Sequence, residues 1–241
     1  MKLENSVVLV TGGNRGLGRA IVVEALARGA RTVYAAARDP KTVTTPGATP
    51  LTLDVTDPRS VAAAADVAGD VTLLVNNAGI LIGADYLRSD LADVRREFET
   101  NFFGPLNVIR AFVPGLLAKG GGHVLNVHSV LSWLAMGGSY SASKAALWSM
   151  TNALRIELAP KNIGVTALHM GYVDTDMAAR VNAAKSSPED IARQALEGVE
   201  GGAFEVLGDE ITRNVKRGLA ADPVVLYPQL ANREGRAVDI A

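Results

Sequence analysis

Short apolar runs alternate along the chain with longer segments in which apolar residues recur at helical spacing. Most of the short runs are continuous rather than alternating, which is typical of strands buried on both faces of a parallel sheet. We expect strands at 6–12, 31–37, 49–54, 71–77, 123–129, 163–170 and 203–208. We expect helices at 16–30, 57–67, 90–118, 140–159, 188–199 and 209–220.

This strand-then-helix order predicts an α/β fold, with a doubly wound, mostly parallel sheet flanked by helices on both faces. No linker, low-complexity tract or internal repeat divides the chain, so we expect one domain over 1–241. The segment 171–187 is polar and aperiodic, and we expect it to belong to a substrate loop near 171–200. The C-terminal tail is expected at 221–241, and its end, 231–241, is expected either to fray or to dock on a partner subunit.

Composition narrows the function classes. The 241 residues are 48% hydrophobic and 20% charged with a net charge of −1, so a sizeable core is expected and nucleic-acid binding is not. Cysteine is absent and the three histidines lack a metal-ligand spacing, so we expect no metal site. No stretch is apolar for the ~20 residues that span a bilayer, and no signal peptide is visible. We therefore expect a cytoplasmic protein without membrane partners.

A glycine-rich turn joins the first expected strand to the first expected helix. It reads TGGNRGLG at 11–18, with Gly12, Gly16 and Gly18. Glycines at this place let backbone N–H groups approach a pyrophosphate at the helix N-terminus. The alternative is a turn that only closes the strand–helix unit, but its position at the first such turn favours a nucleotide. A P-loop is excluded because no Gly-Lys-Ser/Thr follows.

Two arginines indicate which dinucleotide would bind. Arg38 stands about 20 residues beyond Gly18, where an acid would favour NAD and an arginine a 2′-phosphate. Arg15, inside the glycine loop, adds a second guanidinium suited to a phosphate dianion. Asp39 complicates this assignment, because it either faces solvent or orients Arg38. We predict NADP(H) as the cofactor, with NAD(H) less favoured.

Tyr140 and Lys144 place a phenol and an amine one helical turn apart. A free phenol has a pKa near 10 and is a poor base at neutral pH, but a neighbouring ammonium stabilises phenolate. A phenol tuned in this way can exchange a proton with an alcohol oxygen. An isolated Tyr-x-x-x-Lys is more often an ordinary helix N-terminus, so the pair needs support from the rest of the chain.

Seven short motifs supply that support, in order along the chain. They are TGGNRGLG (11–18), LDVTD (53–57), NNAG (76–79), TNFFG (100–104), NVHS (126–129), YSASK (140–144) and MGYVDTDM (170–177). Together they resemble the short-chain dehydrogenase/reductase family in its compact single-domain form. The resemblance spans about 6–177 and is highly specific, because seven separate motifs agree in order.

The resemblance implies a division of roles among four catalytic residues. Tyr140 is the acid or base, Ser129 polarises the substrate oxygen, and Asn101 bends its helix and anchors a water in a proton relay. Lys144 lowers the pKa of Tyr140 and binds the nicotinamide ribose. The cofactor contacts that it implies are Gly12, Asn14, Arg15, Gly16, Leu17, Gly18, Arg38, Asp54, Val55, Asn77, Ala78, Gly79, Tyr140, Lys144, Val173 and Thr175.

The chain departs from the family pattern at several points. Ser129 and Tyr140 are 11 positions apart, which shortens the segment between them, and Met170 replaces the usual proline. Strand alternation places His128 on the face opposite Ser129, which indicates a structural role. The charged run 95–99 is interpreted as a solvated helix face.

These features predict an NADP(H)-dependent oxidoreductase that interconverts a carbonyl and a primary or secondary alcohol. The substrate is expected to be a small, apolar carbonyl compound, since the expected pocket walls carry no charged constellation. A homodimer or homotetramer is expected from the resemblance. The alternative is a catalytically silent, NADP-sensing regulator on the same fold. A nucleotide-sugar epimerase is disfavoured because 241 residues leave little room for its substrate domain.

Overall fold

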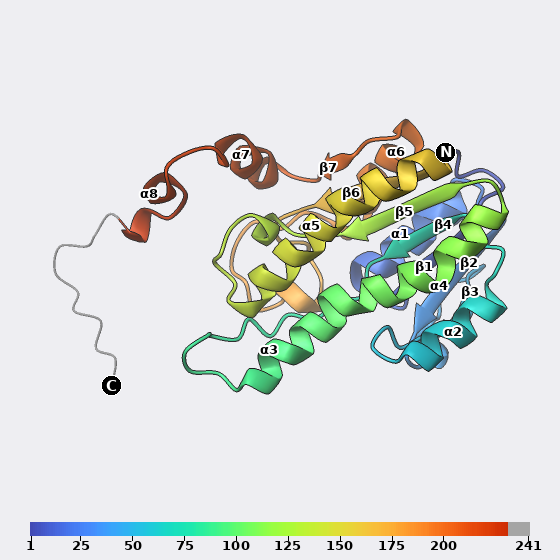
Figure 1. Cartoon of the computed structure of the whole chain (residues 1–241), viewed down its shortest axis with the longest axis horizontal. Helices are drawn as coiled ribbons and strands as arrows, with labels where there is room; N and C mark the ends of the chain where they lie inside the picture. Colours follow the sequence, from blue (N-terminus) through green and yellow to red (C-terminus); the bar gives the residue numbers. More distant parts are fainter. Residues whose placement is uncertain (231–241) are drawn as a thin grey trace.

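All seven expected strands form one parallel sheet in the computed structural model, which describes residues 1–230 (Figure 1). The strand order is β3-β2-β1-β4-β5-β6-β7, and every neighbouring pair is parallel. The strands are β1 (Val7–Thr11), β2 (Thr32–Ala37), β3 (Thr49–Thr52), β4 (Leu73–Asn76), β5 (Gly122–Val127), β6 (Ile163–His169) and β7 (Glu205–Leu207). The predicted doubly wound α/β sheet in a single domain is therefore confirmed.

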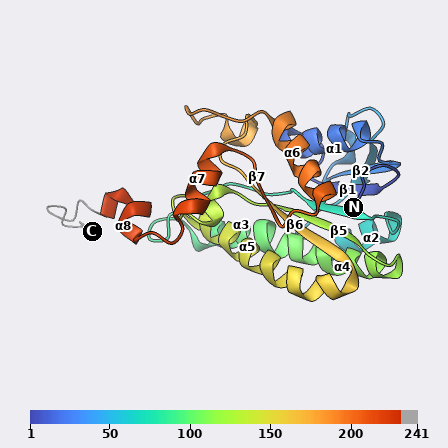
Figure 2. The ribbon, with the colours of Figure 1, turned by 90° about the horizontal axis from the view of Figure 1, so that it is seen from above.

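Helices cover both faces of this sheet. They are α1 (Gly16–Ala27), α2 (Pro58–Val67), α3 (Leu91–Phe98), α4 (Gly104–Ala118), α5 (Ser139–Leu158), α6 (Pro188–Gly201), α7 (Glu210–Gly218) and α8 (Pro223–Leu226). Figure 2 shows α1 and α6 on one side of the sheet and α4 and α5 on the other, whereas α8 extends away from it. None of the described helices is long and apolar enough to cross a membrane.

Burial of continuous apolar strands divides the core into two clusters, one on each face of the sheet. Ile21 of α1 and Leu196 of α6 belong to the first, and neither is exposed. Leu154 and Leu158 of α5 belong to the second, with Leu74 of β4. The apolar stripe of α5 thus packs on the sheet. Helical spacing alone could not decide whether this face meets the sheet or another subunit.

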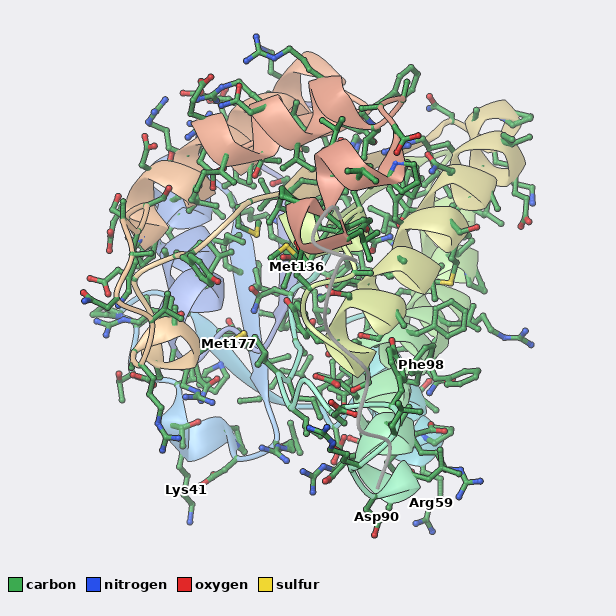
Figure 3. All side chains as sticks on the ribbon, turned by 90° about the vertical axis from the view of Figure 1, so that its left-hand side faces the viewer. Lys41, Arg59, Asp90, Phe98, Met136 and Met177 are labelled. Atoms are coloured by element: carbon green, nitrogen blue, oxygen red, sulfur yellow. The ribbon has the colours of Figure 1, made fainter. Side chains whose placement is uncertain are left out.

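The order of strands reverses between β1 and β4, and this reversal places the functional site. In doubly wound sheets, ligands bind in the crevice at the carboxyl ends of the two strands on either side of the reversal. Figure 3 views the molecule from the left of Figure 1, where the strands end. Met136, which follows β5, and Met177, which follows β6, both lie on this side.

The expected helix over 90–118 forms, and it is distorted at Asn101, where the family resemblance implies a bend. A π-helical turn at 99–103 separates α3 from α4, and Asn101 is buried within it. Such turns arise where tertiary contacts outweigh regular helical bonding, often at functional sites. Gly104, directly after the turn, lies so close to Val55 that a Cβ there would be 2.8 Å from its side chain. Close packing of α4 against the segment after β3 therefore accompanies the distortion.

The expected substrate loop near 171–200 is irregular only over 171–187. That segment holds one 3-10 turn at 176–178 and one bridge between Val173 and Ser186. From Pro188 the chain is helical, because Ser187 caps α6 by accepting a bond from the N–H of Asp190 and proline suits the first helical position. Of the expected tail 221–241, the part 231–241 lies outside the described residues.

Candidate active site

The glycine loop turns sharply between β1 and α1, and two of its glycines are required by the backbone. Gly12 has φ of +64°, a left-handed conformation that favours glycine. A Cβ on Gly18 would stand 2.1 Å from the carbonyl oxygen of Gly12, so no larger residue fits. Leu17 is buried in the core and anchors the first turn of α1. The loop therefore leaves a side-chain-free surface at a helix N-terminus, where phosphates bind.

Hydrogen bonds join the segments that follow β1 and β4, on either side of the point where the strand order reverses. The hydroxyl of Thr11 accepts hydrogen bonds from the N–H groups of Asn77 and Ala78, both at 3.0 Å. The side-chain amide of Asn77 donates to the carbonyls of Thr11, at 2.9 Å, and Gly12, at 3.2 Å. The NNAG motif thus holds the glycine loop against the end of β4. The structure therefore brings together the two motifs that the resemblance assigns to the cofactor.

The turn after β3 lies beside the same crevice. Asp54 accepts bonds from the N–H of Thr56, at 2.9 Å, and from its hydroxyl, at 2.7 Å. Burial works to raise the pKa of Asp54, but these two bonds and the charge of Arg38 outweigh it and hold the pKa below its usual value. Arg38 is exposed and follows β2 directly. An ionised carboxylate in the turn after β3 therefore lies near the exposed guanidinium that follows β2.

The carboxylate of Asp39 accepts a hydrogen bond from the backbone rather than from Arg38. This bond, of 3.0 Å, comes from the N–H of Lys41, and the carboxylate caps the 3-10 turn at 40–42. Asn14 of the glycine loop reaches the same turn, since its amide donates to the hydroxyl of Thr42 at 3.0 Å. Asp39 is exposed and shows no bond to Arg38 within residues 1–230, so of the two expected alternatives it faces solvent rather than orienting Arg38.

The glycine loop also touches the segment that follows β6. Arg15 forms an ion pair of 2.8 Å with Asp176, and both side chains are exposed. A Cβ on Gly16 would lie 3.2 Å from the methyl group of Thr175. Val173, which the family pattern also places at the cofactor, is buried. The sequence suggested no partner for Arg15, because 161 positions separate it from Asp176.

Asn101 projects from the π-helical turn towards the segment after β4. Its oxygen accepts from the N–H of Ile80, and its amide donates to the Ile80 carbonyl, both at 2.9 Å. The amide also donates to the hydroxyl of Ser143, at 3.1 Å. Gly79 lies beside it, since a Cβ there would be 3.2 Å from the Asn101 oxygen and 3.7 Å from the amine of Lys144. Asn101 therefore ties the NNAG segment to α5, and the water relay stays a prediction.

Ser129 caps the 3-10 turn at 130–132 that follows β5. Its hydroxyl accepts from the N–H of Leu131 at 3.1 Å, and its own N–H donates to the hydroxyl of Ser132 at 3.4 Å. The same Ser129 hydroxyl acts on the Tyr140 phenol, whose pKa it lowers against the effect of burial. Ser129 therefore lies near the tyrosine, as the family pattern implies.

Tyr140 is buried in the first turn of α5, with 7% of its surface exposed. Burial raises the pKa of Tyr140 to about 12, the negative charge of Glu97 adds to this rise, and the hydrogen bond from Ser129 opposes it. The expectation that Lys144 lowers this pKa is therefore not met here, because desolvation of the phenolate dominates. At neutral pH the phenol carries its proton.

Lys144 lies one helical turn further along α5 and is 4% exposed. Its amine donates a bond of 2.9 Å to the carbonyl of Val127 and lies 5.8 Å from the centroid of the Tyr140 ring. Burial lowers the pKa of Lys144 to about 8, and the charge of Glu97 partly offsets this fall. The amine is therefore held close to its titration point between the strand end and the tyrosine.

A stack of three aromatic rings lies next to Ser129. His128 lies on His169 with centroids 4.7 Å apart, and His169 lies on Trp133 at 4.1 Å. His128 meets Thr151 of α5 at 3.1 Å, as does Asn126 two residues earlier, at 2.9 Å. Alternation therefore continues through His128, and the extended backbone of Ser129 agrees with the predicted opposite orientation of the two side chains.

The contacts of these stacked rings indicate a structural role. Burial lowers the pKa of His128 well below its usual value, so the ring is neutral. Lys216 of α7 lies 4.6 Å from the ring centre of Trp133 and pairs with Glu205 at 2.7 Å. Sequence reasoning missed this cluster, because its members come from β5, β6, β7 and α7 and share no spacing.

The interpretation of 95–99 as a solvated face is wrong at Glu97, which is fully buried. Its carboxylate accepts bonds from the N–H of Ile82, at 2.6 Å, and of Gly83, at 3.1 Å. Glu97 stands four residues before Asn101, so the two side chains share one helical face. That spacing is the signal by which the sequence could have revealed a buried carboxylate.

The residues present fit a nicotinamide dinucleotide. The Cβ-free glycine loop and the α1 N-terminus suit a pyrophosphate, and Asp54 and Arg38 stand where the adenosine end would lie. Gly79, Lys144 and Tyr140 line the other end of the crevice. Within residues 1–230, no cluster of acidic and histidine side chains could hold a metal ion.

Comparisons with known proteins agree with this geometry. Residues 6–186 match the family described as short chain dehydrogenase. The ketoacyl reductase HetN of Nostoc sp. is 30% identical over 227 residues, covering 85% of this chain and 79% of its own. A crystal structure of a short chain dehydrogenase from Burkholderia cenocepacia J2315, in complex with NADP, is 40% identical with a TM-score of 0.90. It covers 95% of this chain and 99% of its own.

A second structure bears on the cofactor. The short chain dehydrogenase/reductase from Burkholderia phymatum, in complex with NAD, is 26% identical with a TM-score of 0.82. The alignment covers 90% of this chain and 93% of that one. Since the family profile matches most of the chain, this protein belongs to the short-chain dehydrogenase/reductase family of oxidoreductases that act on alcohols and ketones.

Proposed function

We propose that this protein is an NADP(H)-dependent carbonyl reductase, with Tyr140 as its proton donor. The observation that carries this proposal is the buried phenol of Tyr140, which keeps its proton at neutral pH beside the hydroxyl of Ser129. A protonated acid suits the reduction of a carbonyl, in which a proton must reach the oxygen. Alcohol oxidation would need the phenolate, which burial disfavours.

Each residue of the site has a distinct part in this reaction. NADPH, when bound, supplies the hydride. The hydroxyl of Ser129 donates a hydrogen bond to the substrate oxygen and polarises it, while the Tyr140 hydroxyl delivers its proton to the same oxygen. Lys144, in its ammonium form, binds the nicotinamide ribose and stabilises the phenolate that remains. Asn101 holds the wall of the crevice by fixing Ile80, and reprotonation of Tyr140 proceeds through the predicted water relay.

A preference for NADP over NAD is supported by charge at the adenosine end. Arg38 is exposed directly after β2, and the preceding residue is Ala37, so no acid stands at the end of that strand. Asp39 turns its carboxylate to Lys41 instead. A guanidinium binds a 2′-phosphate by paired hydrogen bonds, which NAD cannot offer. The complex of the Burkholderia cenocepacia relative with NADP supports the same choice.

A small, apolar carbonyl substrate is supported by the side chains around the opening. The segment 130–138 between Ser129 and Tyr140 has no charged residue. Three large apolar side chains of this segment and of 171–187 are exposed: Met136 at 62%, Tyr172 at 43% and Met177 at 51%. Asp174 and Lys185 pair with each other at 3.6 Å. This apolar contact area supports an uncharged substrate.

The direct test is turnover of a panel of ketones and aldehydes with NADPH and, separately, with NADH. We expect steady consumption of NADPH with aromatic or aliphatic carbonyls, and at least about tenfold lower kcat/KM with NADH. Tight binding of NADPH without turnover of any carbonyl would instead support the NADP-sensing regulator. A cytoplasmic homodimer or homotetramer also stays a proposal, which light scattering of the purified protein tests.

A further inference from the structure

Glu97 and Lys144 are the only acidic or basic side chains, histidines aside, that are buried within residues 1–230. Glu97 is not exposed at all and Lys144 is 4% exposed. Removing a charge from water is strongly unfavourable unless hydrogen bonds or an opposite charge compensate. The two charges have opposite signs and come from neighbouring helices, α3 and α5. The burial of these two charges near Tyr140 therefore needs a physical explanation.

The carboxylate of Glu97 is saturated with donors from two other segments. One oxygen accepts from the N–H groups of Ile82 and Gly83, and the other accepts from the hydroxyl of Ser139. The Ser139 hydroxyl in turn accepts a bond of 3.0 Å from the N–H of Ala84. Three donors thus compensate the burial of this carboxylate. Glu97 therefore joins the segment 80–84 to the first residue of α5.

This junction is adjacent to the reacting groups on both sides. Ser139 immediately precedes Tyr140, so the bond to Glu97 fixes the turn of α5 that carries the phenol. Ile80 to Gly83 directly follow Gly79, which lies beside the Lys144 amine. Asn101, one turn beyond Glu97, holds Ile80 from the same helical face. Two side chains of one helical segment thus clamp the wall of the crevice.

The charge of Glu97 also acts on both titratable groups. Burial is the main cause of the raised pKa of Tyr140, and Glu97 raises it further. Burial lowers the pKa of Lys144, and Glu97 raises it against that effect. A nearby negative charge disfavours phenolate and favours ammonium, so it keeps a proton on both groups. That is the state from which a carbonyl can be reduced.

We propose that Glu97 is a positioning residue of the active site, whose carboxylate clamps the first turn of α5 to the segment 80–84 and places a negative charge behind Tyr140 and Lys144. This inference rests on the proposed function, because it assigns Tyr140 and Lys144 their roles. It goes beyond that function by giving the site a buried counter-charge.

The charge is tested by Glu97→Gln, which keeps the shape and one acceptor oxygen. We expect the high-pH limb of kcat/KM for NADPH-dependent reduction to move down by about 0.5 to 1 pH unit, because Lys144 loses its proton more easily. Glu99→Gln is the matched control, since Glu99 is exposed and two residues away. Its profile should overlay that of the unmodified protein. A Glu97→Gln profile that also overlays it overturns the role of the charge.

A second readout does not depend on turnover. The dissociation constant of NADPH, followed by its fluorescence across the same pH range without any carbonyl, reports on the charge of Lys144. We expect the same downward movement in Glu97→Gln. If the unmodified protein reduces no carbonyl, the proposed function fails while this titration still decides the part played by Glu97.

The clamp is tested separately by Ser139→Ala, which keeps the carboxylate and removes its contact with α5. We expect kcat to fall about tenfold with the high-pH limb unmoved, since only the placement of Tyr140 changes. An unaltered kcat contradicts the clamp. This variant also decides the matter if Glu97→Gln does not yield folded protein.

Discussion

The guanidinium of Arg15 lies 2.8 Å from the carboxylate of Asp176, and this ion pair joins the glycine loop to the segment that follows β6. Both side chains are mostly exposed, at 71% and 79%, so the pair contributes little to stability. Because it is weak, a phosphate dianion can draw Arg15 away at small cost. If Arg15 binds the cofactor as predicted, the pair connects cofactor binding to the segment 171–187, which is predicted to form the substrate loop.

Replacement of Arg38 by leucine tests the assignment of the 2′-phosphate site. We expect Arg38→Leu to raise KM for NADPH by about 10- to 100-fold and to leave KM for NADH within about threefold, because only NADPH carries the phosphate. Arg15→Leu should have a smaller effect, since Arg15 must first leave Asp176. Initial rates with each cofactor at a fixed carbonyl concentration measure both.

The matched control is Arg110→Leu, which removes an exposed arginine from α4. It should change neither KM. Equal losses with NADPH and NADH in Arg38→Leu would contradict the proposed site, because a general loss of binding does not depend on the 2′-phosphate.

The pH dependence of reduction follows from the two perturbed groups. Burial raises the pKa of Tyr140 to about 12, so the phenol stays protonated throughout the neutral range. Burial lowers the pKa of Lys144 to about 8, so the ammonium is lost as the pH rises through that value. We expect kcat/KM for NADPH to be constant below about pH 8 and to fall up to tenfold per pH unit above it. A profile without a bend near this value would contradict the role of Lys144.

His128 is expected to matter for stability rather than for chemistry. Its ring bonds to Thr151 at 3.1 Å and stacks on His169 within the core. His128→Phe keeps the stacking and removes the bond, so we expect about 1 to 2 kcal/mol lower free energy of unfolding. The kcat should stay within about threefold. Urea unfolding and initial rates test this pair of expectations, and a large fall in kcat at unchanged stability would make His128 a catalytic group.

The places of the strands along the chain could be predicted because most are continuous apolar runs, as VVLVT in β1 shows. The distortion between α3 and α4 could be predicted only from the family resemblance at Asn101, because it accompanies the tertiary contacts of Asn101 with Ile80 and of Gly104 with Val55. No local pattern marks these contacts. Helical periodicity continues through them, so the sequence reads as one helix.

The structure brings together the main site residues that the family motifs predicted. The pKa shifts of these residues could not be predicted from the sequence. A spacing of four between Tyr140 and Lys144 predicts that the two are close, and it does not reveal that burial outweighs their attraction. Nor does it reveal Glu97, which adjoining charged residues concealed within an exposed-looking run. Burial depends on the packing of α3 against α5, and that packing is a tertiary property.

The most direct test of the central claim is a single-turnover measurement of NADPH oxidation with Tyr140→Phe and an active carbonyl substrate. The variant removes only the hydroxyl that is proposed to donate the proton, so we expect the rate to fall at least about 1,000-fold while the dissociation constant of NADPH changes less than about threefold. A rate within about tenfold of the unmodified protein, with NADPH bound normally, would contradict the account.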